Sequence, residues 1–495
     1  MLLLILFSPL IGAALILFGA PPRRSALFVA VVSLLLAVAA FVEFSRLGSG
    51  GADFKFVNSF NIVPEFHLTF TVGVDGLSLA MVLLATIVTV AAVWFTGTLP
   101  RYERAFYVCL LLISSGTIGA FVSLDLFFFY AFHELALIPT FLLIGIWGSG
   151  NRVAAAWKVT IYLGLGSFIL LIGLIMLYQS LPPDARTFDM RAFKSLASQI
   201  SPNDQRNIFL VLLIGFGTLI SLFPFHSWAP EAYASAPAPA AMLHAGVLKK
   251  FGLYGILRLA LPLLPEGVHH WGGLLTVLLL GNIIYIGLAT IAQNRLDWML
   301  GYSSVMHMGY IFLGIATASV LGTTGAAILM FAHGLSIALL FAVAGEVRKR
   351  TGTLVFDDLG GLAKVMPMAS LAFGFGAFAA IGLPGFTNFA AEIMVFFGAI
   401  QKGWEIERLH LFQIATVLAL WGVVISAVYM LRAYRSAFMG SMPERWGEIT
   451  DLKKSLRVPL ALLIGALLWF GFFPQTLVRI VSPSLQTSLA VPNSP

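Results

Sequence analysis

Long apolar runs separated by short polar stretches fill almost the whole chain. A helix needs roughly 20 apolar residues to cross the hydrocarbon core of a bilayer. The pattern predicts fourteen such spans, at about 2–20, 25–45, 74–97, 105–123, 125–147, 157–180, 207–229, 236–262, 271–293, 299–319, 322–346, 367–399, 411–432 and 457–477. The longest loops, 46–73 and 181–206, are too short to hold a soluble domain. We therefore expect an all-α polytopic membrane protein with a single transmembrane domain.

Composition agrees with this prediction. The 495 residues are 59% hydrophobic and only 10% charged, whereas a soluble domain has about 25% charged residues. The net charge of +7 does not indicate nucleic-acid binding, because the positive charges lie mostly in short loops between spans. The single cysteine, Cys109, excludes an internal disulfide and a cysteine-ligated iron–sulfur cluster, and it provides no zinc site. Arg23 and Arg24 follow the first apolar run, which favours a first span over a signal peptide.

The distribution of lysine and arginine predicts the orientation of the chain. Seventeen lie on one side of the predicted spans, ten on the other, and two, Lys249 and Lys250, lie inside a span. The richer side should be cytoplasmic. An even number of spans then places both termini on the outer side.

Two spans are interrupted by proline. TLISLFPFHSWAPE (218–231) contains Pro224 in the seventh span, and FAAIGLPGFTNFAAE (378–392) contains Pro384 in the twelfth. The two spans are five positions apart in the chain, so the two segments would run in opposite directions, as in transporters built from inverted repeats. The alternative is that proline is simply common in membrane helices.

Several ionisable residues are predicted to lie at membrane depth, where they are costly and therefore functional candidates. They are Glu134, Lys250, Glu392, His226, His244, His307 and His333. A low dielectric favours the neutral form of a carboxyl or an amine, and a nearby opposite charge restores the charged form. Histidine titrates nearest neutral pH and can relay protons between them. Acids, bases and relays with no metal-ligand spacing and no activated nucleophile indicate proton movement.

Each candidate also has a structural interpretation. Glu134 and Glu392 could bind serine or backbone groups, and His307 and His333 could hydrogen-bond across helices. Lys250 could extend to the membrane surface, an interpretation that suits Lys249 better. His133, His269 and His270 are expected to be interfacial or structural. GFGAFA (374–379) matches a dinucleotide-binding pattern, but it lies inside an apolar span and lacks the strand–helix context that this motif requires.

Five ordered motifs resemble those of a known family: HELALIP, PFHSWAPEAY with APAP and AGVLKK, NRLDWMLGYSSVMHMGY, AHGLSIALLF and GLPGFTNFAAE. Together they resemble the antiporter-like membrane subunits of respiratory complex I, which are related to subunits of multisubunit cation/proton antiporters. The M-type fits best, because the chain stops at Pro495 without a long lateral helix and carries Glu392 where the N-type usually has lysine. WAPEAY and APAP are somewhat N-like, so the N-type stays open.

The resemblance implies a fold, and it implies which functions belong to this chain and which to partner subunits. It implies three N-terminal spans (1–104), two inverted five-helix repeats (105–262 and 271–432), and a last span with the C-terminus (457–495). It implies a proton path through Glu134, Lys250, His307, His333 and Glu392, with His226 in the P-x-H motif. This chain would hold no redox centre and bind no cofactor or metal. NADH, FMN, iron–sulfur clusters and quinone would belong to partner subunits, and L-, N- and K-type subunits would adjoin it in a bacterial inner membrane.

One position departs from the family pattern. The family places a lysine in the seventh span, five residues before the proline, where this chain has Leu219. That lysine normally pairs with the fifth-span glutamate. Our hypothesis is that Lys158 replaces it as the partner of Glu134. The alternatives are that this chain pumps weakly or not at all, or that Lys249 compensates.

Two other functional classes stay open. The chain could be a subunit of a cation/proton antiporter without a redox partner, carrying H⁺ or Na⁺. It could also be a stand-alone transporter of a small solute, although the sequence shows no solute pocket with convergent polar groups. Co-purification with a flavin and iron–sulfur arm would favour complex I over both.

Overall fold

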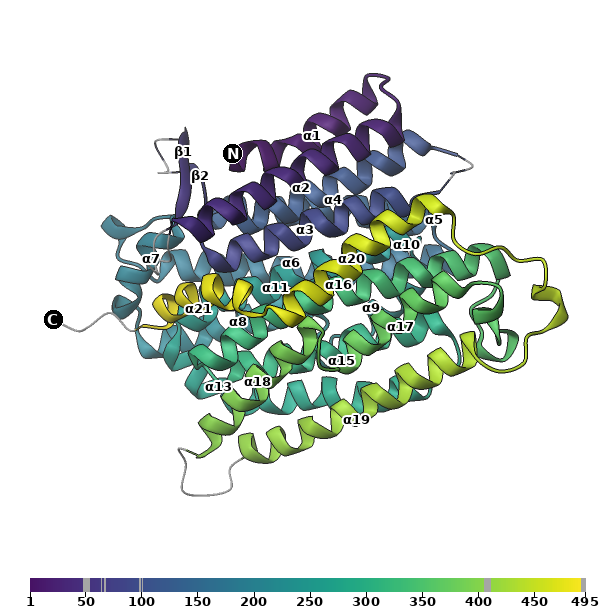
Figure 1. Ribbon diagram of the computed structural model, residues 1–495. Coiled ribbons are helices and arrows are strands. Elements are labelled where there is room, and N and C mark those ends of the chain that lie inside the picture. The colour runs from purple at the N-terminus through teal and green to yellow at the C-terminus, as the bar shows by residue number, and fades with distance from the viewer. Residues whose placement is uncertain are drawn as a thin grey trace.

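The computed structural model describes residues 1–47, 54–63, 65, 68–97, 99, 101–404 and 411–490. It is an all-α bundle of roughly aligned long helices, with one two-stranded hairpin beside it (Figure 1). Within the described ranges, ten helices are long and apolar enough to cross a membrane. The expectation of an all-α polytopic protein is confirmed.

The first half of the chain contains two strands and the helices up to the eighth predicted span. Their bounds are α1 Leu2–Leu17, α2 Pro22–Arg46, β1 Lys55–Val63, β2 Leu68–Val74, α3 Gly76–Phe95, α4 Glu103–Val122, α5 Leu126–Trp147, α6 Arg152–Gln179, α7 Met190–Leu196, α8 Pro202–Ile220, α9 Trp228–Ser235, α10 Ala238–Leu243, α11 Lys250–Gly255 and α12 Leu261–Leu263. The second half follows with α13 Pro265–Leu280, α14 Gly287–Ile291, α15 Leu296–Ala316, α16 Val320–Thr351, α17 Pro367–Ile381, α18 Thr387–Trp404, α19 Leu411–Phe438, α20 Arg457–Phe472 and α21 Gln475–Leu489.

Each predicted span overlaps one helix or one interrupted helix, and the number of membrane crossings stays a prediction. The sequence did not indicate the antiparallel pair β1 and β2, which lies in the predicted loop 46–73. It also did not indicate α21, whose apolar residues line only one face. The start of α1 and the end of α21 lie on the same side of the bundle as the hairpin (Figure 1). The final residues of the predicted 457–495 segment, 491–495, lie outside the described residues.

The seventh span breaks around Pro224, as predicted. Helix α8 ends at Ile220, Ser221 follows with a left-handed φ of 68°, and α9 begins at Trp228. The side chain of Asn282, from the ninth span, fills the break. Its Oδ1 accepts from the N–H of Phe223 at 2.7 Å, and its Nδ2 donates to the carbonyls of Ser221 at 3.2 Å and Val305 at 2.9 Å. Backbone groups freed by a broken helix thus find protein partners, as they must inside a membrane.

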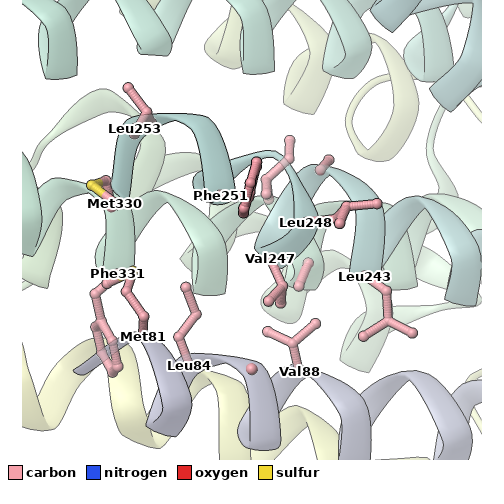
Figure 2. Close-up of a cluster of buried hydrophobic side chains, with 14 of the residues drawn as sticks. Met81, Leu84, Val88, Leu243, Val247, Leu248, Phe251, Leu253, Met330 and Phe331 are labelled. Atoms are coloured by element: carbon pink, nitrogen blue, oxygen red, sulfur yellow. The ribbon is translucent and has the colours of Figure 1, made fainter. Parts of the chain in front are cut away.

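The eighth span is packed between α3 and α16. Glycine allows the approach: a Cβ on Gly334 would lie 2.6 Å from the carbonyl oxygen of Gly246, too close for any side chain. On the α3 side, Leu84 and Val88 face Val247 (Figure 2). Small residues at such crossings let membrane helices come together closely. The span therefore lies at the centre of the bundle, with a π-helical turn at His244–Leu248 directly before Lys249 and Lys250.

A buried ion pair joins the N-terminus of α3 to the far end of the eighth span. Both Nη atoms of Arg258 donate to the Asp75 carboxylate, at 2.7 and 2.6 Å, and both side chains are less than a tenth exposed. Asp75 also accepts from the N–H of Ser78 at 2.9 Å and so caps α3. A bidentate pair of this kind fixes the relative positions of its two side chains. Removal of one partner would leave the other as an unpaired buried charge, which is costly.

We expect Asp75→Asn or Arg258→Met alone to destabilise the protein by about 3–5 kcal/mol, because each leaves an uncompensated buried charge. The double variant Asp75→Asn/Arg258→Met should lose much less than the sum of the two. Thermal unfolding of the purified protein in detergent measures all three. Additive losses would show that the two groups act independently.

Candidate functional site

Lys250 is fully buried at the start of α11, and its partners are few and well defined. Its Nζ donates to the carbonyl oxygen of Ala245 at 2.6 Å and lies 3.0 Å from Nδ1 of His333 on α16. The alternative interpretation, that Lys250 extends to the membrane surface, is wrong. The lysine and the histidine, predicted separately, form one unit across the close contact of Gly246 and Gly334.

His307 continues this unit. Its ring centroid lies 5.4 Å from that of His333. Its Nδ1 lies 2.8 Å from the carbonyl oxygen of Ser303, and its Nε2 lies 2.9 Å from that of Ala380. A ring whose two nitrogens both face acceptors has both contacts satisfied only when both carry hydrogen.

Glu392 lies beyond His307, at the break of the twelfth span. Helix α17 ends at Ile381, and Gly382 follows with a φ of 80°. The Glu392 carboxylate is against Gly382, where a Cβ would collide with its Oε2. Glu392 is 6% exposed, so it is enclosed by protein. The Ala380 carbonyl that faces His307 belongs to the same last turn of α17, which brings the base and the acid to the two sides of one break.

Lys249 is buried, which contradicts the interpretation that it extends to the membrane surface. It is 2% exposed; its Nζ donates to the carbonyl oxygen of Ser304 at 3.2 Å and lies 5.6 Å from the centroid of the Tyr233 ring. The side chain is held by Ser304 of α15 and Tyr233 of α9 instead of extending outward.

Glu134 lies apart from these groups, on α5 at its contact with α6. Ser167 donates a short hydrogen bond to its Oε1, and Nδ1 of His133 lies 3.6 Å from the same oxygen. The His133 ring stacks on Phe251 at 3.9 Å, next to Lys250 in the chain. The Glu134 side chain is 37% exposed, and its neighbours on this outer face are apolar.

The hypothesis that Lys158 pairs with Glu134 is wrong. Nζ of Lys158 donates to Oε2 of Glu231 at 2.9 Å. Ser167, which binds Glu134, lies nine residues further along α6, or about 13 Å along the axis. Lys158 is therefore nearer the end of the helix and meets the second half of the broken seventh span instead.

His226 is also apart from the central group. It stacks on Phe223 at 5.7 Å, close to Tyr285, and its Nδ1 is among the buried side-chain atoms without a partner in the described part of the chain. Sequence reasoning missed Asn282, Ser167, Glu231 and Tyr233. Only Asn282 and Glu231 gave a usable signal, as polar residues within or beside apolar spans.

The fold and the buried array of lysine, histidines and glutamate define a class: polytopic helical membrane proteins with titratable groups midway along their helices. Residues 123–419 match the family model described as NADH:quinone oxidoreductase/Mrp antiporter, TM. The chain belongs to this family.

Relatives extend over nearly the whole chain. NADH-quinone oxidoreductase subunit M of Rickettsia conorii is 32% identical over 98% of this chain and 97% of its own length. F(420)H(2) dehydrogenase subunit M of Methanosarcina mazei is 33% identical over 97% of this chain and 96% of its own length. A chain in respiratory complex I from Thermus thermophilus superimposes with a TM-score of 0.88 at 26% identity, covering 99% of both chains. A chain of the Mrp complex from Dietzia shares the fold, with a TM-score of 0.82 at 20% identity and 99% of both chains covered.

We expect Gly382→Ala to destabilise the protein by about 2–5 kcal/mol, since it combines a strained left-handed backbone with a collision against Glu392. Gly19→Ala is the matched control: its φ is 107°, but no atom lies within 4 Å of an added Cβ. It should cost only the backbone strain, about 1–2 kcal/mol. Thermal unfolding measures both, and Glu392→Ala should relieve the excess in Gly382→Ala. Equal losses for the two glycines would place the carboxylate away from Gly382.

Proposed function

We propose that this chain carries protons through the membrane part of an NADH:quinone oxidoreductase. The observation that carries the proposal is the buried series Lys250, His333, His307 and Glu392, which joins two broken or distorted spans at the centre of the bundle. The family and its subunit M relatives support it.

The Lys250–His333 contact suits proton exchange. As an ammonium, Lys250 donates to Ala245 and to an unprotonated Nδ1 of His333. As a neutral amine, it accepts from a protonated Nδ1. Both states keep the 3.0 Å contact, so a proton can change place without a change of partner.

His307 then acts as the relay toward Glu392. Protonation satisfies both of its carbonyl contacts, and deprotonation leaves one ring lone pair facing a carbonyl oxygen. Loss of the proton is thereby linked to movement at the last turn of α17, beside Glu392. An interconversion of this kind can respond to charge changes elsewhere in a larger assembly.

The remaining parts of the reaction belong to other chains. This subunit would be a non-redox part of the translocase, with electron transfer from NADH through FMN and iron–sulfur clusters to quinone in partner subunits. L-, N- and K-type membrane subunits would adjoin it. In a bacterial inner membrane the lysine- and arginine-rich end, which includes Arg152, Arg295 and Arg348, would face the cytoplasm, with both termini periplasmic.

The exposed side of Glu134 fits a subunit contact. A carboxylate at this depth is costly against lipid. Glu134 is one-third exposed on a face that also presents Ile138, Trp157 and Phe168. A neighbouring membrane subunit that covers this face would remove the carboxylate from lipid and bring it into the path.

A subunit of a cation/proton antiporter is the second candidate. The family model names both assemblies, and the Dietzia chain matches the fold over its full length. Purification from the native membrane separates the two: a flavin and iron–sulfur arm with the chain supports the oxidoreductase, and antiporter subunits alone support the alternative.

We expect Lys250→Met to reduce coupled proton pumping at least tenfold in proteoliposomes containing the assembled complex, since the central exchange group is lost. Pumping is read from quenching of a pH-sensitive dye during NADH oxidation. Lys454→Met, at an exposed lysine between α19 and α20, is the control and should pump normally. Undiminished pumping by Lys250→Met in a fully assembled complex would refute the proposed function.

Leu219→Lys tests what the missing family lysine would do. Leu219 lies beside Gly166 of α6, and Ser167, which follows Gly166 in the chain, binds Glu134. A lysine at position 219 would therefore reach toward the Glu134 carboxylate. We expect Glu134 to stabilise it: a double-mutant cycle of Leu219→Lys with Glu134→Gln should give a coupling of about 1 kcal/mol or more by thermal unfolding. Additive changes would show that the two positions do not meet.

A further inference from the structure

A cavity of about 200 Å³ lies at the lysine- and arginine-rich end of the bundle. The ends of α3, α5 and α16 and the proline-rich 236–241 stretch line it, and its lining includes Trp147, Ser149, Tyr233, Pro237, Gly345 and Arg348. It reaches the surface beside Lys349, whose side chain is 49% exposed. The volume holds several water molecules.

Tyr233 is part of the inner wall of this cavity. It is 2% exposed, and its ring is packed against those of Trp228 at 6.0 Å, Phe341 at 5.9 Å and His244 at 5.4 Å. Its hydroxyl is buried and without a hydrogen-bond partner. A buried hydroxyl in this state commonly marks a place for water.

Lys249 lies behind the Tyr233 ring. The ring face stabilises an ammonium at this distance, 5.6 Å from Nζ to the centroid. Two further buried polar atoms nearby are without partners, Nδ1 of His244 and Oγ of Ser304. Tyr233 thus contacts a buried lysine through its ring and also lines the cavity.

Lys249 is also connected inward. It donates to the carbonyl of Ser304, and Nδ1 of His307 contacts the carbonyl of Ser303, the preceding residue on α15. The two titratable groups therefore meet adjacent peptide groups of one helical turn. Two other titratable groups are close to Lys249. They are His244, on the π-helical turn, and Lys250, the next residue in the chain.

We propose that this cavity is the proton-uptake vestibule of the subunit, with Tyr233 as its gate and Lys249 as the first residue to accept a proton. The inference rests on the proposed function and deepens it. In the step, a proton from bulk solvent passes along cavity waters that bind the Tyr233 hydroxyl, and the innermost water gives a proton to the neutral Nζ of Lys249 while it regains one from the water behind it. One N–H bond forms as one O–H bond breaks, and a net proton moves from solvent to the lysine.

The test compares pumping by the assembled complex in proteoliposomes for Lys249→Met, Tyr233→Phe and Lys250→Met. We expect the first two to reduce the ratio of protons pumped to NADH oxidised at least threefold. Tyr107→Phe is the matched control, because it removes another buried, unpartnered hydroxyl, from α4, that does not line the cavity. It should pump normally. The amount of assembled complex and its NADH oxidation rate establish that each variant has folded.

A second arm tests the location independently of these side chains. In a Cys109→Ser background, Ala236→Cys lines the vestibule and Ala197→Cys lines a different cavity, at the opposite end. A membrane-impermeant thiol reagent applied from the lysine- and arginine-rich side should block pumping by Ala236→Cys and leave Ala197→Cys unaffected.

The outcomes separate the two ideas. If Lys250→Met abolishes pumping while Lys249→Met, Tyr233→Phe and labelled Ala236→Cys pump normally, the vestibule is refuted and the proposed function stands. If Lys250→Met itself pumps normally, the proposed function falls and the vestibule with it.

Discussion

The hydrogen bond between Lys250 and His333 depends on a constraint that governs the whole bundle: in a medium without water, every polar group must find a partner in the protein. Two glycines, Gly246 and Gly334, bring the eighth span close enough to α16 for that contact. The distorted turn before Lys250 and the break beside Glu392 then supply the carbonyls that the lysine and His307 use. The irregular backbone segments thus provide hydrogen-bond partners for the ionisable side chains.

The same constraint explains why some ionisable groups are enclosed by protein while one lies on the outer face. Where polar groups are numerous, around the eighth span, α15, α16 and the break of the twelfth span, they are enclosed by protein. Glu134, by contrast, is on the outer face with a serine and a histidine beside it. An isolated chain leaves that carboxylate partly uncovered, which is consistent with a protein that functions inside a larger membrane assembly.

The sequence predicted the helices well because their signal is local: an apolar run has one stable arrangement in lipid. It also predicted that Lys250, His307, His333 and Glu392 are buried, since the cost of burying charge depends on residue type and depth. It did not predict partners. Lys158 meets Glu231 because of axial positions that only the assembled bundle fixes, and the burial of Lys249 depends on packing against α9 and α15. The β hairpin and α21 were missed because neither carries a long apolar run.

Asn282 has a consequence for how the two halves of the chain can move. Its one amide joins the loop between α8 and α9 to the carbonyl of Val305 on α15, so it bridges segments that belong to opposite halves of the sequence. A rigid rotation of either half about the other would break both hydrogen bonds that join this one side chain to Phe223 and Ser221. Small local rearrangements, rather than the rocking of whole halves, are therefore the motions this architecture favours.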